Sequence, residues 1–530
     1  MMLRRRHLLA AGGTAALPSR PSFAQPASAR VLKFVPQADL SSLDPVWTTS
    51  NVTRNHGYMV WDTLYGADSN FVPRAQMAEG HVEEDGGKIV TITLRAGLKF
   101  HDGETVRARD CVASLNRWMR RNPMGQVLLD SYLDELSAVD DRRIRFRLKR
   151  PFPQLIPALA LPSAPVALMM PERIASTDPF QQIREAVGSG PYRFNASEQR
   201  SGAFASYERF RDYSPTPVAG SGFTAGPKIA HFDRIEWHVI PDPATAANAL
   251  ITGEIDWFEQ MPPEIVELLR RQRTLAVDFM DNLVFPCSLR LNHAQPPFDN
   301  PAIRRALLPA INQQDFVTAI VGPFPDRYHV GSGFFTPDTP LANDEALGPL
   351  NGPRDLNLTK RLLREAGYNG EPIRLLGTTD IISTSAMAQV AIDLFRRLEV
   401  NLDVALSDWG GLVQRRTNRG PVAQGGWSAV CFANSGMDFV IPGTHNSLRA
   451  DGRSATPGWP VSPELEAARL SWFDAPDLAT QQRGAREIQR LAMRDLPYIP
   501  LGGYRSMTAY KRALADRVKG FAIFWGIRRT

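Results

Sequence analysis

The sequence predicts an α/β fold divided into more than one lobe, on three observations. The chain has 530 residues, whereas a single hydrophobic core stops growing at roughly 250 to 300 residues. Segments with strand periodicity alternate along the chain with segments of helical periodicity. Residues 232–261 have the length and order of a βαβ unit, which favours a parallel sheet with a ligand crevice at the strand ends. We therefore expect two or three lobes of mixed α/β structure.

The first 24 residues are predicted to be an export signal. Three adjacent arginines precede a small-residue apolar run, and "SFA" and "ASA" offer cleavage after Ala24 or, as the alternative, after Ala29. Arg5 and Arg6, followed by His-Leu-Leu, also resemble the twin-arginine pattern. The apolar run, about ten residues, is shorter than the roughly 18 to 20 that span a bilayer. We expect an exported, periplasmic protein whose signal is cleaved.

Charge and composition bear on partners and cofactors. Residues 1–24 carry four arginines and no acid, so their removal lowers the formal net charge from +6 to +2. No Lys/Arg tract with interleaved aromatics remains, which argues against a nucleic-acid partner. The chain has no CxxC or HExxH, and its nine histidines are scattered, so we expect neither a metal site nor a cofactor. One disulfide could form among Cys111, Cys287 and Cys431, or all three could remain buried thiols. Their spacing does not distinguish between these alternatives.

The elements of the first half follow in order. A short strand is expected after Ala29, and residues 90–121 are predicted to form an alternating strand, an Asp-Gly turn and an amphipathic helix. Strict alternation then predicts a strand with Ile144, Phe146 and Leu148 on one face and solvated arginines on the other. Within the βαβ unit we expect a helix at 244–251, stopped by Gly253, and a strand at 255–258.

The second half of the chain also alternates helical and strand patterns. A helix is expected to begin at Pro301, another to end at Gly367, and a long amphipathic helix to lead into a strand before Asp408. Two more helices are expected within 462–495. No tandem repeat of 20 to 50 residues is present, which excludes solenoids and propellers.

Seven stretches, taken in this order, resemble extracellular solute-binding protein family 5, the periplasmic dipeptide and oligopeptide receptors of ABC importers. They are "SLDP…VWDTL", "LKFHDGETVRARDCVASLNR", "GSGPYRF", "PDPATAANALITGEID", "LNHAQPPFDNPAIRRAL", "RLLREAGY" and "GGW". They extend over nearly the whole mature chain.

The resemblance implies a two-lobe periplasmic-binding-protein fold with a hinge and an extra α/β subdomain inserted in the first lobe. We expect lobe I to comprise residues 30–60, 188–282 and 498–530, the inserted subdomain 61–187, and lobe II 283–497. Two strands near 283–291 and 498–510 should cross between the lobes. The implied partners of this monomer are a small-molecule solute, bound as the lobes close, and the transmembrane permease of an ABC transporter.

The resemblance also implies one wall of the ligand site. In peptide receptors of this family a loop usually runs Gly-Trp-x-Ala-Asp, and its Asp pairs with the α-ammonium group of the peptide. Here Gly426 and Trp427 are followed by Ser428, Ala429 and Val430, so valine replaces the acid. An ammonium group without a counter-charge in a dry cleft would cost several kcal/mol. We therefore expect a solute that is neutral, acidic or blocked at its amine.

The predicted ligand contacts on this wall are Trp427, Ser428, Val430 and Asn434, with Asp438 as a position from which an acid could still act. The opposite wall should come from "SLDPVWTTSN", where a gap-free alignment with the family puts Thr49, Ser50 and Asn51 at a ligand-facing turn.

Two alternative functions are an exported hydrolase and a binding protein used for sensing. An exported hydrolase would need a nucleophile with a base, or a metal-bound water, and the chain has no GxSxG motif or zinc-ligand helix. We therefore do not expect an enzyme. A binding protein used for sensing rather than transport remains open on the sequence.

Overall fold

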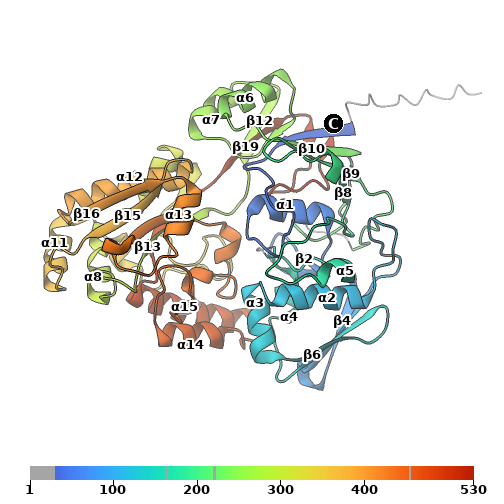
Figure 1. Ribbon diagram of the computed structural model, residues 1–530, viewed down its shortest axis with the longest axis horizontal. Coiled ribbons are helices and arrows are strands. Elements are labelled where there is room, and N and C mark those ends of the chain that lie inside the picture. The colour runs from blue at the N-terminus through green and yellow to red at the C-terminus, as the bar shows by residue number, and fades with distance from the viewer. Residues whose placement is uncertain (1–29, 163–164, 219–221, 453–454) are drawn as a thin grey trace, which may run out of the picture.

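The computed structural model describes residues 30–162, 165–218, 222–452 and 455–530. The predicted export signal and its cleavage positions lie outside these ranges. Figure 1 shows two bodies side by side, with thin connections between them near the top and a contact near α3, α14 and α15 below.

The first lobe is built on a seven-stranded mixed sheet. β1 lies next to β10 on one side and β11 on the other, parallel to both, which is the parallel arrangement expected of the βαβ unit. Its core is aromatic: the Phe34 ring lies 4.9 Å from Trp257 and 5.0 Å from Phe524. The strand order is β12 (Leu275–Phe279), β19 (Met507–Lys511), β11 (Trp257–Phe258), β1 (Val31–Val35), β10 (Arg234–His238), β9 (Phe204–Arg209), β8 (Tyr192–Phe194). Its helices are α1 (Asn51–Val60), α6 (Pro243–Thr252) and α7 (Pro263–Arg270).

A four-stranded antiparallel sheet and short helices form the inserted subdomain. The alternation of β7 is as expected, because Ile144, Phe146 and Leu148 are buried. The sheet order is β4 (Ala78–Glu84), β5 (Ile89–Leu94), β7 (Arg143–Leu148), β6 (Leu133–Ala138). The helices are α2 (Ala108–Met119), α3 (Pro123–Val127), η3 (Leu128–Tyr132), α4 (Leu155–Ala160) and α5 (Glu172–Ala175), and a small sheet pairs β2 (Tyr65–Ala67) with β3 (Pro73–Ala75).

The second lobe has a six-stranded sheet in which β15, β16 and β17 are parallel. The order is β14 (Tyr328–His329), β18 (Ile499–Tyr504), β13 (Phe285–Leu291), β17 (Ala429–Ala433), β15 (Ile373–Thr378), β16 (Leu402–Ser407). Its helices are α8 (Pro301–Ala306), α9 (Gln313–Val321), α10 (Gly348–Asn351), α11 (Leu356–Glu365), α12 (Ile382–Arg397), α13 (Trp409–Arg415), α14 (Pro463–Trp472) and α15 (Leu478–Asp495). The chain ends with a β20 (Leu514–Ala515) and β21 (Arg528–Arg529) pair.

Two segments connect the two large sheets. One runs from β12 to β13 through residues 280–284, and the other from β18 to β19 through residues 505–506. β18 belongs to the sheet of the second lobe, so the last first-lobe segment, expected at 498–530, begins in this structure at β19. The other predicted domain boundaries stay predictions.

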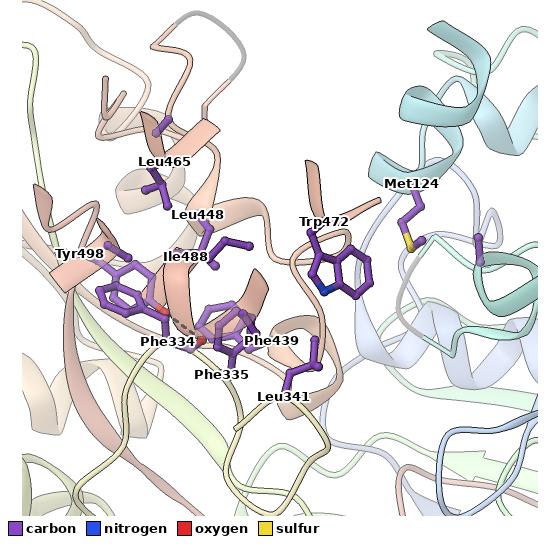
Figure 2. Packing of buried hydrophobic residues seen from close by; sticks show 14 of the residues in the cluster. Met124, Phe334, Phe335, Leu341, Phe439, Leu448, Leu465, Trp472, Ile488 and Tyr498 are labelled. Atoms are coloured by element: carbon purple, nitrogen blue, oxygen red, sulfur yellow. Dashed lines mark hydrogen bonds between the residues drawn. The ribbon is translucent and has the colours of Figure 1, made fainter. Parts of the chain in front are cut away.

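The lobes are in contact on the side of the inserted subdomain. The Tyr132 hydroxyl donates to Asp474 at 2.7 Å, and Arg150 forms an ion pair with the same carboxylate. In Figure 2, Met124 on α3 lies across from Trp472 of α14, and both side chains belong to one apolar cluster that continues into the core of the second lobe. The two lobes are therefore in direct contact on this side.

Cys111, Cys287 and Cys431 are all buried and free, so the disulfide alternative is not realised in this structure. Among the described residues, no helix is both long and apolar enough to cross a membrane.

Candidate functional site between the lobes

The predicted first-lobe residues lie at the start of α1. Thr49 and Ser50 are exposed and Asn51 is half-buried. The Ser50 carbonyl accepts from the Arg54 backbone at 2.9 Å, whereas its side chain makes no capping bond. Just upstream, the Asp44 carboxylate accepts from the backbone N–H of the next turn and from a buried arginine of α2. This segment is therefore held firmly while its polar side chains remain free of the helix.

On the second-lobe side, β17 ends at Ala433 and is followed by Asn434. The Asn434 backbone donates to the Pro286 carbonyl at 3.0 Å, while its Oδ1 atom is buried without a hydrogen-bond partner in the described part of the chain. Asp438 lies in the short helix η8 (Gly436–Phe439).

The two walls meet at Arg54. This α1 side chain is 5% exposed; burial lowers its pKa, and the Asp438 carboxylate is the largest influence that raises it. Met437 and Val440, which flank Asp438, belong to the apolar cluster of the first lobe. The structure therefore brings Arg54, in the first turn of the helix that follows Thr49 and Ser50, close to Asp438 in the segment that follows Asn434.

Two buried acids, Glu259 and Asp281, lie close enough to Arg54 to influence its pKa. Burial raises the pKa of Glu259 to about 7, although Gln37 N–H and Asn55 Nδ2 donate to the carboxylate at 2.7 and 3.1 Å. Burial likewise raises the pKa of Asp281 to about 6, and this residue lies in the crossing segment. Both acids stabilise the charge of Arg54.

Three of the predicted ligand residues do not lie at this interlobe contact: Trp427, Ser428 and Val430. Trp427 is fully buried, its Nε1 donates to the Arg416 carbonyl at 2.8 Å, and its ring packs 6.2 Å from that of Trp459. Ser428 is buried and its Oγ accepts from the Arg374 backbone at 3.0 Å. Val430 is a fully buried strand residue.

The reason is that strand β17 lies within the stretch from Gly425 to Asp438 and separates its two ends. Trp427 and Ser428 precede this strand and Asn434 follows it, and the extended chain between Trp427 and Asn434 spans roughly 20 Å. In parallel sheets, ligands bind outside the carboxyl ends of the strands. Asn434 is at that edge, and Trp427 and Ser428 are at the opposite one, so the structure does not bring them together. The ligand roles of these residues stay predictions.

Sequence reasoning missed Trp409. It follows the carboxyl end of β16 at the start of α13, is 39% exposed, and contacts Phe432 edge to face at 5.8 Å. Its backbone donates to Asp380, at the end of β15, at 3.1 Å. The signal was the Asp-Trp pair directly after a predicted strand, because a side chain there lies at the ligand-binding edge.

A cavity of about 610 Å³ also lies between the lobes, within the size range of small-molecule sites. First-lobe residues after β1 and β11, such as Gln37 and Gln260, line it together with Ile382 of α12 and Ser506 of the crossing segment. The lining includes none of the eight predicted ligand residues. It shares Asp380 with the contact made by the Trp409 backbone.

The titratable groups in the two cores are suited to structure rather than to proton transfer. Burial lowers the pKa of His56 to about 3, and its Nδ1 contacts Tyr207 Oη at 2.9 Å. His445 has a similarly lowered pKa and contacts Tyr498 Oη at 2.9 Å. In the described ranges, no group of three or more His, Cys, Asp or Glu side chains is placed to hold a metal ion.

Known proteins resemble this chain along its whole length. A probable peptide ABC transporter periplasmic-binding protein of Sinorhizobium fredii is 34% identical, with all of both chains covered. A glutathione-binding protein of Pectobacterium atrosepticum is 27% identical over 97% of this chain and 96% of its own. These relatives are binding proteins, and the chain is accordingly not an enzyme.

Solved structures share the fold. A Helicobacter pylori periplasmic binding protein in complex with the peptide STSA has a TM-score of 0.77 at 22% identity, covering 94% of this chain and 98% of its own. An agropinic acid complex from A. tumefaciens R10 also scores 0.77, at 18% identity, covering 94% and 99%. The model of the bacterial extracellular solute-binding proteins, family 5, matches residues 72–446. The chain has the two-lobe periplasmic-binding-protein fold and belongs to this family.

Proposed function

We propose that this receptor captures a small organic solute, peptide-like or a modified peptide, where α1 faces the end of β17, and delivers it to an ABC import permease. First-lobe contacts come from Thr49, Ser50 and Asn51. Second-lobe contacts come from Asn434 and Asp438.

The observation that supports this location is a set of buried polar atoms on both walls. Arg54 Nε and Asn55 Oδ1 of the first lobe, and Asn434 Oδ1 of the second, have no hydrogen-bond partner among the described residues. Buried polar groups in native proteins are nearly always paired, and leaving one unpaired costs about 1 to 3 kcal/mol. A polar solute between the lobes would supply the missing partners.

The charges at this contact favour a solute that is neutral, acidic or blocked at its amine. Arg54 contributes a guanidinium group to the first-lobe wall. Asp438 is close enough to influence Arg54, so its charge is partly balanced within the protein.

Calorimetry on the mature chain tests this proposal. Glutathione, Met-Leu and N-acetyl-Met-Leu serve as probes, alongside any solute that native mass spectrometry finds in protein purified from its own periplasm. Arg54→Gln and Asn434→Ala should each weaken the bound solute by about tenfold, since each removes a polar contact. The exposed Arg486→Gln on α15 is the control. If both variants keep the wild-type affinity and Gln260→Ala loses binding, the solute site is instead the interlobe cavity that Gln260 lines.

Uptake separates transport from sensing. Deletion of the gene should abolish uptake of the bound solute, and the wild-type chain should restore it. If uptake of every bound solute is unchanged, the protein serves a sensing role instead.

We also infer that residues 1–24 direct export to the periplasm and are removed, and that the receptor is a monomer. N-terminal sequencing of periplasmic protein should begin at Gln25, or at Arg30 for the alternative site. Replacing Arg5 and Arg6 by lysine should block export if the twin-arginine route is used. Light scattering should give the mass of a single chain.

A further inference from the structure

Two arginines of the second lobe share one aromatic ring. Phe432 on β17 has the Arg290 guanidinium carbon 5.6 Å from its ring centre and that of Arg416 at 5.0 Å. Arg290 is on β13 and is 5% exposed. Arg416 directly follows α13 and is partly buried.

Neither guanidinium has a carboxylate partner in the described part of the chain. Arg290 donates to two hydroxyls, Thr456 Oγ1 at 2.7 Å and Ser447 Oγ. The Arg416 Nε atom is buried and has no partner among the described residues. Burial and the neighbouring Arg416 charge lower the pKa of Arg290 to about 10. Burial also lowers the pKa of Arg416.

Two other buried cations of this protein are neutralised directly by a carboxylate. Arg117 pairs with Asp44 at 2.6 Å and Lys228 with Asp62 at 2.6 Å, all four side chains being almost fully buried. A buried charge without a counter-charge costs several kcal/mol. The Arg290–Arg416 pair has no such counter-charge among the described residues, and an anion would offset its cost.

Phe432, the ring that the two arginines share, precedes Asn434 of the proposed solute contact by two residues. Arg290 is directly opposite Val430 in the β13–β17 register, so strand alternation puts Arg290, Val430, Phe432 and Asn434 on one face. At the carboxyl edge of the sheet, the partly exposed Trp409 contacts Phe432.

We propose that Arg290 and Arg416 form an anion subsite that binds a carboxylate of the solute, while Phe432 and Trp409 pack against the apolar or flat group next to it. This rests on the proposed function, because the subsite would be one end of the same solute site. A subsite of this kind restricts the solute to compounds that carry a carboxylate. Guanidinium groups bind carboxylates through charge-assisted, directional hydrogen bonds, which a neutral amide does not reproduce.

Benzoate and benzamide are a matched pair of probes, equal in shape and different in charge. Benzoate should raise the midpoint of thermal unfolding of the mature protein, and benzamide should not. In calorimetry, Arg416→Gln should weaken benzoate by at least about tenfold. The neighbouring exposed Arg415→Gln, on the same helix, is the control and should match wild type. Among the described residues the Arg416 side chain donates no hydrogen bond, so this variant should fold even if Arg290→Gln does not.

The outcomes are distinct. Equal effects of benzoate and benzamide on wild type, or equal benzoate binding in Arg416→Gln and wild type, would overturn the subsite. Preference for phenyl phosphate over benzoate would overturn the carboxylate assignment. Failure of the proposed function is a separate result, seen as no co-purified solute and no change of uptake on deletion.

Discussion

Trp427 and Trp409 have contrasting surroundings, although both belong to the second lobe. Trp427 is fully buried with its indole N–H bonded to a backbone carbonyl, so it contributes packing. Trp409 keeps 39% of its surface at the edge of the sheet where the lobes meet. An aromatic side chain in that position offers a flat apolar face to a solute.

Alanine at these two positions should therefore separate stability from affinity. Trp427→Ala should lower the free energy of unfolding by about 3 to 5 kcal/mol, because it leaves a cavity in a packed cluster. Trp409→Ala should weaken solute binding by about 1 to 3 kcal/mol with little change in stability. Urea denaturation and calorimetry measure the two quantities. A stable Trp427→Ala that loses the solute would instead support the ligand role predicted from the sequence.

Glu259 should make stability depend on pH. Its pKa is raised by burial from 4.5 to about 7, so between these values the folded protein binds more protons than the unfolded chain. The contribution of this group is fully present below about pH 4.5 and is lost as pH rises through 7. The loss is at most about 3 kcal/mol.

Glu259→Gln isolates this effect, because other groups titrate equally in both proteins. The difference in unfolding free energy, wild type minus variant, should fall between pH 4.5 and 7 and level off above 7. A difference that stays constant across this range would show that the carboxylate is ionised throughout.

At the scale of elements, the sequence-predicted helices agree closely with the structure where capping signals are strong. α6 begins at Pro243 after an Asp242 cap and ends before Gly253, which adopts a left-handed conformation. α8 begins at Pro301 after an Asn300 cap. These ends are set by local backbone chemistry, which a sequence displays directly.

The ion pair of Arg117 with Asp44 joins helix α2 to the segment that leads into α1. Both side chains are buried, and two N–H groups donate to the carboxylate at 3.0 and 2.6 Å. Asp44→Asn should lower the free energy of unfolding by about 3 to 5 kcal/mol, because it leaves a buried guanidinium uncompensated. The control, Asp140→Asn in an exposed pair with Arg143, should leave the urea midpoint unchanged. Equal midpoints for all three proteins would contradict a structural role for the buried pair.

At the scale of the whole molecule, Arg327 and Glu267 form an ion pair across the interlobe cavity. Arg327 precedes β14 of the second lobe and is fully buried, whereas Glu267 lies on α7 of the first. The Nη2–Oε1 distance is 2.7 Å, and Arg327 Nε and Nη1 have no partner among the described residues. In this structure a first-lobe carboxylate therefore neutralises a second-lobe guanidinium.

Glu267→Ala should therefore shift the population toward the open form. Because Glu267 is half-exposed, we expect about 1 kcal/mol, or roughly a fivefold change in the open-to-closed ratio. Small-angle scattering should give a larger radius of gyration for the variant, and solute affinity should fall by a similar factor. Glu264→Ala, on the same helix, is the control. An unchanged radius would mean that this pair does not stabilise closure.

The sequence by itself determined the α/β class and the family, and it predicts a first-lobe wall at Thr49, Ser50 and Asn51. Periodicity, caps and ordered motifs are local properties and can be read along the chain. Only the tertiary structure decided the second-lobe wall. The stretch around Trp427 is strand as well as loop, and which end of a strand faces the other lobe depends on how the sheet is assembled. Arg290 and Arg416 are far apart in sequence, and only strand pairing and the packing of α13 bring them to one ring.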